Sequence, residues 1–127
     1  MHNFRKLDIW IDGVDLADRV YALTDSFPRQ EVYGLSSQMQ RAAVSVPSNI
    51  AEGSGKDSDA DFSRFLAIAL GSLFELETQV EIAYRRAYLS SENYYSLRTH
   101  IESLQKRIYN FRQYIVTPSS ATPDRKC

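Results

Sequence analysis

The sequence predicts an all-α fold, an antiparallel up-down-up-down four-helix bundle. Apolar residues recur at steps of three and four along four segments, which short polar connections join. No segment shows the period-two alternation and turn residues of a β-hairpin. With 127 residues, 43% of them hydrophobic and 24% charged, the chain is large enough for one core. We therefore expect a single bundle domain over residues 1–116 and a flexible polar tail over residues 117–127.

The first helix is predicted over residues 7–26 and ends before Pro28, because a residue that precedes proline resists the helical conformation. Its expected core stripe is Trp10, Val14, Ala17 and Tyr21, with Ile9, Leu16, Val20 and Leu23 beside it. The second helix is predicted to begin near residue 35. Its expected stripe is Leu35, Met39, Ala42 and Val46.

Residues 46–56, VPSNIAEGSGK, look at first like the end of a phosphate-binding loop. A Walker A loop requires Gly-x-x-x-x-Gly-Lys followed by Ser or Thr, after a strand. Here an isoleucine stands five residues before Gly55 and an aspartate follows Lys56, so the nucleotide interpretation fails. We expect instead that the second helix bends at Pro47, which lacks a backbone donor. Gly53 or Gly55 is then expected to end it in the left-handed conformation.

The third helix is predicted over residues 58–89, where Ser58 and Asp61 resemble a capping box. Its stripe is Phe62, Leu66, Ala69, Leu73, Leu76, Val80, Ala83 and Ala87. The fourth helix follows an expected cap at Ser91 and ends at Thr117. Its stripe is Tyr94, Leu97, Ile101, Leu104, Ile108, Phe111 and Ile115. The short join between these two helices predicts an antiparallel hairpin.

Polar side chains between the second and third predicted helices form one candidate site. Asn49 continues an apolar stripe, so we expect it to face the interior, where a buried amide needs hydrogen-bond partners. The predicted buried polar cluster consists of Arg41, Ser45, Asn49, Glu52, Ser72 and Glu75. Such a cluster either fixes register and oligomeric state or forms a small acid–base or ion site. The first role is favoured, because no histidine or cysteine joins the two glutamates at metal-ligand spacing.

The charge is unevenly distributed along the chain. Residues 1–84 hold seven basic and thirteen acidic residues, a net −6, whereas residues 85–127 hold eight basic and three acidic ones, a net +5. Opposed charges of this kind favour self-association or a local basic face for an anionic partner. The candidate residues for binding RNA or single-stranded DNA are Arg98, Lys106, Arg107, Tyr109 and Arg112. The alternative is an ordinary solvated helix face.

Other function classes have weaker support. Glu52, Glu75 and Arg41, with Tyr84 or His100, are the best residues for catalysis, but nothing has the strand-turn-helix context that presents a nucleophile. We predict no enzyme activity, no metal site and no cofactor. The only cysteine is the last residue, and no apolar run is long enough for a signal peptide or a membrane span. The sequence therefore predicts a cytoplasmic protein without membrane binding.

The stretches QMQRAAVSVPSNIAEG and ALGSLFELETQ resemble the small four-helix-bundle proteins encoded within intervening sequences of bacterial 23S rRNA genes. The resemblance extends over residues 4–115. The matching motif positions are Gln38, Arg41, Ala42, Ser45, Pro47, Asn49, Glu52, Gly53, Gly71, Ser72 and Glu75.

The resemblance implies a bundle that assembles as a ring-shaped homopentamer, of unestablished cellular role. It also points to a distant relative, the accessory variability determinant of diversity-generating retroelements, a strongly basic pentamer that binds nucleic acid and a reverse transcriptase. This chain departs from that relative with a sequence pI near 6.1, which weakens the transfer of nucleic-acid binding. We therefore expect a non-catalytic, homopentameric scaffold, with binding of RNA or DNA as the alternative. Gly71 is interpreted as a point of close helix approach.

Overall fold

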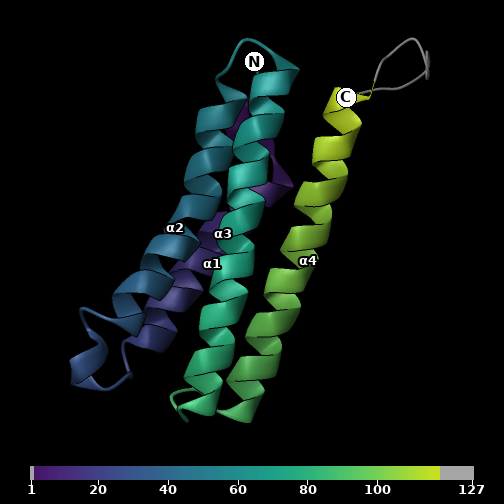
Figure 1. Ribbon diagram of the computed structural model, residues 1–127. Helices are drawn as coiled ribbons and strands as arrows, with labels where there is room; N and C mark the ends of the chain where they lie inside the picture. Colours follow the sequence, from purple (N-terminus) through teal and green to yellow (C-terminus); the bar gives the residue numbers. More distant parts are fainter. Residues whose placement is uncertain (1, 118–127) are drawn as a thin grey trace.

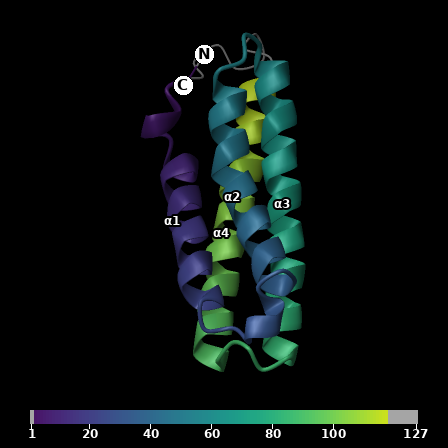
Figure 2. The ribbon, with the colours of Figure 1, turned by 90° about the vertical axis from the view of Figure 1, so that its left-hand side faces the viewer.

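The computed structural model describes residues 2–117. Its elements in chain order are η1 (Phe4–Lys6), α1 (Asp8–Thr24), η2 (Arg29–Glu31), α2 (Leu35–Ser54), α3 (Asp59–Arg85) and α4 (Ser91–Val116). The long helices alternate in direction, each packs against the next in the chain, and α4 closes the bundle against α1 (Figures 1 and 2). The predicted fold class is confirmed. The tail prediction falls on residues 118–127, which lie outside the described residues.

Serine side chains begin the two longest helices. The Ser58 hydroxyl accepts a hydrogen bond from the backbone N–H of Asp61 at 3.1 Å, as predicted for the start of α3. The cap of α4 is Ser90, which accepts from Asn93 N–H at 3.1 Å. Ser91, the residue expected to cap this helix, is its first helical residue instead. Each cap satisfies a backbone donor that the first helical turn leaves without a partner.

The C-terminal end of α3 lies four residues earlier than predicted. Ala87 adopts φ 64°, the left-handed region that non-glycine residues rarely occupy. Tyr88 N–H then donates to the carbonyl of Ala83 at 2.9 Å, and Ala87 N–H donates to that of Tyr84 at 2.9 Å, the two bonds of a Schellman motif. Ala87 is therefore an exposed helix terminator, and its predicted place in the core stripe is wrong.

The glycines near the end of α2 have a different role from the one predicted. The helix continues through Pro47 and ends at Ser54, and no described glycine has a positive φ. At Gly53, an added Cβ would lie 2.6 Å from Phe65 Cβ and 2.9 Å from Phe62 Cδ1. Gly53 thus allows α2 and α3 to approach closely. By contrast, a Cβ on Gly71 would meet nothing within 4 Å, so the close approach expected at Gly71 does not occur within the chain.

The core runs through the centre of the bundle along all four helices. Its largest wholly buried side chains are Phe62, Leu16, Met39, Ile50, Leu66, Leu73, Leu76, Leu97, Ile101, Leu104, Ile108 and Val20. The prediction for α3 and α4 is largely confirmed, but the stripe predicted for α1 is wrong at Val14 and Tyr21, although Ala17 is buried and Trp10 packs against the core. Val14 and Tyr21 are 40% and 49% exposed, whereas Ile9, Leu16 and Val20 are buried. None of the helices in residues 2–117 combines the length and apolarity needed to cross a membrane.

Candidate interaction surfaces

The predicted polar cluster forms a surface groove between α2 and α3. Ser45 and Ser72 share a hydrogen bond across the two helices, with their hydroxyl oxygens 2.8 Å apart. The Asn49 amide donates to the Ser45 carbonyl at 2.8 Å and to its hydroxyl at 2.9 Å. A groove of about 260 Å³ lies beside these contacts. Its lining residues are Gln38, Arg41, Ala42, Ser45, Ser72 and Glu75.

The prediction that this cluster is buried is wrong. Arg41, Glu52 and Glu75 are exposed, and Ser45, Asn49 and Ser72 are half-buried. Because α2 turns this face outward along its contact with α3, the polar contact of the cluster that joins the two helices is the Ser45–Ser72 hydrogen bond, and the Asn49 bonds stay within α2. Glu52 does not line the groove.

A second polar cluster, which the sequence prediction missed, joins α1 to α4. His100 Nε2 lies 2.7 Å from Asp12 Oδ1, and Arg107 pairs with the other oxygen of the same carboxylate. Arg19 donates to His100 Nδ1 at 3.3 Å and also bonds to Ser96. A guanidinium only donates hydrogen bonds, so Nδ1 accepts and Nε2 carries the proton that is donated to Asp12.

The carboxylate of Asp12 is the electrostatic centre of this α1–α4 cluster. Partial burial raises the pKa of Asp12, but the hydrogen bonds from Arg107 and His100 outweigh burial and hold that pKa below its ordinary value. The sequence did contain a signal for the cluster. Asp12 and Arg19 are seven residues apart, as are His100 and Arg107, so each pair shares one side of its helix.

Three of the five residues predicted to bind nucleic acid are engaged within the chain. Arg98 donates to the Tyr94 hydroxyl at 3.3 Å and to Glu102 at 3.2 Å. Arg107 pairs with Asp12 as above, and Arg112 Nε donates to the carbonyl of Ser63 at 3.0 Å. These guanidinium groups are therefore largely occupied in holding α4 to itself and to its neighbours.

The other two predicted residues, Lys106 and Tyr109, line a groove between α3 and α4. The groove has two sections. The first is apolar, has a volume of about 410 Å³ and is lined by Leu70, Phe74, Gln105, Lys106, Tyr109 and Asn110. Phe74 and Tyr109 are 53% and 51% exposed. We call the whole feature the α3/α4 groove, because Phe74 also lines a second section beside it.

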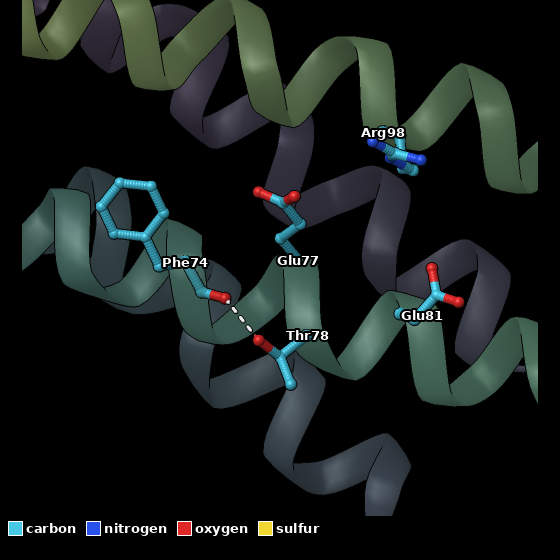
Figure 3. Close-up of a pocket in the computed structure, with 5 residues that line it drawn as sticks. All are labelled: Phe74, Glu77, Thr78, Glu81 and Arg98. Carbon is cyan, nitrogen blue, oxygen red and sulfur yellow. Dashed lines mark hydrogen bonds between the residues drawn. The ribbon is translucent and has the colours of Figure 1, made fainter.

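The second section of the α3/α4 groove, of about 430 Å³, is lined by Phe74, Glu77, Thr78, Glu81 and Arg98 (Figure 3). Arg98 comes from α4 and the other residues come from α3, where the Thr78 hydroxyl donates to the Phe74 carbonyl at 3.0 Å. The Tyr94 hydroxyl donates to Glu81, and this bond lowers the pKa of the Glu81 carboxyl. Within residues 2–117, no group of three or more His, Cys, Asp or Glu side chains is placed to hold a metal ion.

The comparisons with known proteins agree with this architecture. The family model described as 23S rRNA-intervening sequence protein matches residues 5–110. The chain belongs to this family. It is also similar to the crystal structure of a protein of unknown function from the S23 ribosomal protein family of Bacteroides thetaiotaomicron VPI-5482. The two share 26% sequence identity with a TM-score of 0.75, over 83% of this chain and 98% of the other. No curated protein matches the chain significantly.

The motif positions that resemble the family gather on the α2–α3 side of the bundle. Six of them line the polar groove, namely Gln38, Arg41, Ala42, Ser45, Ser72 and Glu75. Pro47 and Gly53 are buried where α2 meets its neighbours, since Pro47 packs against Gly13 of α1 and Gly53 packs against α3. The motif thus combines packing residues with a polar surface.

Proposed function

We propose that the protein acts as a non-catalytic, homo-oligomeric scaffold in which five copies form a ring. The observation that carries this proposal is the presence of large exposed apolar side chains on two separate sides of the bundle. One set lies on α1, with Ile11, Val14 and Tyr21, and the other lies in the α3/α4 groove, with Phe74 and Tyr109. Clustered apolar surface of this kind marks sites of protein association.

The separation of the two sets favours a closed ring. If one set of a copy packs on the other set of the next, every copy leaves the same pair of surfaces available, and the contact repeats until rotation closes it. The number five rests on the resemblance to the family. The opposite net charges of residues 1–84 and 85–127 support a head-to-tail contact of this type.

The arrangement of the residues considered for catalysis also supports a scaffold. Glu52 lies outside the polar groove, and Tyr84 stacks on Tyr94 with ring centroids 3.9 Å apart. His100 is held between Arg19 and Asp12. Of the residues considered for catalysis, Arg41 and Glu75 share the polar groove between α2 and α3, and Glu52, Tyr84 and His100 do not join them there.

Sedimentation velocity over a wide range of protein concentrations tests the proposal. A single species of five times the 14.5 kDa chain mass is expected. A species of one chain mass at every concentration would overturn it. Repeating the measurement at rising salt separates the two sources of affinity, because screening weakens charge pairs and leaves apolar contacts intact.

Binding of RNA or single-stranded DNA is the second candidate function. Lys106 and Tyr109 favour it, since both are exposed beside Phe74, and a lysine with aromatic rings is typical of sites that bind unpaired bases. Labelled RNA and single-stranded DNA should then bind more weakly as salt rises, and Lys106→Glu should weaken binding further. Lys56→Glu, at a position two residues beyond the end of α2, serves as the matched control. Equal binding by both variants would exclude the α3/α4 groove as the nucleic-acid site.

A further inference from the structure

We infer that the outer face of α1 of one copy packs into the α3/α4 groove of a second copy, with the two bundles side by side at the same height. The inference rests on the proposed assembly and specifies its contact surface. It commits to a second copy of this chain as the occupant of the groove. The argument comes from the chemistry of the two surfaces and from their heights along the bundle.

The α3/α4 groove has an apolar centre, with Lys106 at its apolar section and Arg98 beside Glu77 and Glu81 at its second section. Phe74 lies where its two sections meet, and Lys106 makes no ion pair within residues 2–117. The side chain of Arg98 at the other section remains 37% exposed. Glu81 is paired with Arg85, and Glu77 accepts a hydrogen bond from Gln105, so the two carboxylates of the groove are engaged within the chain. A partner that fits the groove therefore presents apolar side chains, with carboxylates placed toward Lys106 and the exposed part of Arg98.

The outer face of α1 has this composition. Ile11 and Val14 are exposed on it, together with Asp15 and Asp18, neither of which forms an ion pair in the described part of the chain. The only basic residue of α1 is Arg19, and its side chain turns away to bond to α4. The face is thus apolar and acidic, complementary to the groove.

The α1–α4 cluster fixes the relative heights of the two surfaces. Asp12 contacts both His100 and Arg107, so along the bundle axis it lies level with the middle of residues 100–107 of α4. Arg19 contacts Ser96 and His100, so it lies level with residues 96–100. Ile11 is therefore level with the section of α4 that lines the apolar part of the groove, and Asp18 is level with Arg98.

Cyclic symmetry brings surfaces of equal height together. Rotation about an axis parallel to the bundle moves no atom along that axis, so each residue meets a residue at its own height. Under this symmetry Ile11 of one copy meets Phe74 of the next, and Asp18 meets Arg98. The apolar pair and the charged pair fall into register together, without any sliding of one bundle along the other.

The test introduces opposite charges at the two apolar surfaces of the full-length chain. Phe74→Glu and Ile11→Lys should each raise the dissociation constant of the oligomer about thirtyfold or more, the level of an interface hot spot. The double variant Ile11→Lys/Phe74→Glu should regain assembly, because the two new charges would pair between copies. Ile82→Glu is the matched control, since Ile82 lies on α3 outside the groove and is 46% exposed, as Ile11 is.

Sedimentation velocity, with circular dichroism to check the helical fold, separates the outcomes. If wild type and Ile82→Glu assemble while Phe74→Glu dissociates and the double variant reassembles, the inference stands. If wild type assembles and Phe74→Glu assembles equally well, this contact is wrong and the proposed scaffold is untouched. A double variant that stays dissociated also overturns the pairing. If wild type is monomeric at every concentration, the proposed function itself fails.

Discussion

Replacing Gly53 with alanine is expected to destabilise the bundle by about 1–2 kcal/mol, although alanine is the better helix former. The new Cβ would lie 2.6 Å from Phe65 Cβ and 2.9 Å from Phe62 Cδ1. Carbon atoms in contact prefer about 3.5 Å or more, so the helices must separate locally by about 1 Å. The Phe65 atom is a Cβ fixed to the backbone of α3, and Phe62 is wholly buried, so neither neighbour has room to rotate away.

The magnitude follows from two opposing contributions. Overpacking a close-packed core costs about 1–3 kcal/mol, and the fixed position of the Phe65 Cβ places this site in the upper half of that range. Replacing glycine with alanine inside a helix stabilises the helix by about 1 kcal/mol. Because Gly53 has no positive φ, an alanine at this position adds no backbone strain to these two contributions.

Gly71→Ala provides the matched control for Gly53→Ala, because it makes the same chemical change in open space. A Cβ on Gly71 would meet nothing within 4 Å, so only the gain in helix propensity of about 1 kcal/mol should remain. Urea unfolding followed by circular dichroism, at one fixed protein concentration, measures both variants. The two substitutions should shift stability in opposite directions. A Gly53→Ala variant as stable as wild type would refute the inferred close approach.

Three further substitutions test individual contacts. Asp12→Asn should lower the free energy of unfolding by about 1 kcal/mol near neutral pH, because it removes the carboxylate that Arg107 pairs with. The folded-state pKa of Asp12 lies below its ordinary value, so this difference should hold above about pH 4 and vanish as the pH falls through the folded-state pKa. Urea titrations of wild type and Asp12→Asn across this pH range measure the difference in unfolding free energy. A difference that persists in strong acid would contradict the prediction. Gln79→Met should raise the melting temperature, since the buried Gln79 Oε1 has no hydrogen-bond partner in residues 2–117; a lower melting temperature would count against this. Ser90→Ala should lower the unfolding free energy by about 1 kcal/mol through loss of the α4 cap, and unchanged urea stability would show that the cap contributes nothing.

The sequence alone determined the number of helices, their order and the inward faces of α3 and α4. In α3 the longest regular apolar stripe, from Phe62 through Leu73 to Val80, is the one that the structure buries. The start of α3 was predictable for a similar reason. A hydroxyl at Ser58 meets a backbone donor three residues later whatever surrounds the helix.

Only the tertiary structure decided the features that depend on how one helix is turned toward another. Helix α1 carries two apolar stripes of equal period, and contact with α2 and α4 selects the one with Leu16 and leaves Val14 exposed. The same rotation brings Asp12 within reach of His100, a residue 88 positions later in the chain. Helical periodicity relates residues within one helix, whereas the rotation and height of each helix depend on its neighbours. Local pattern therefore predicts which faces a helix offers, and packing decides which of them is buried.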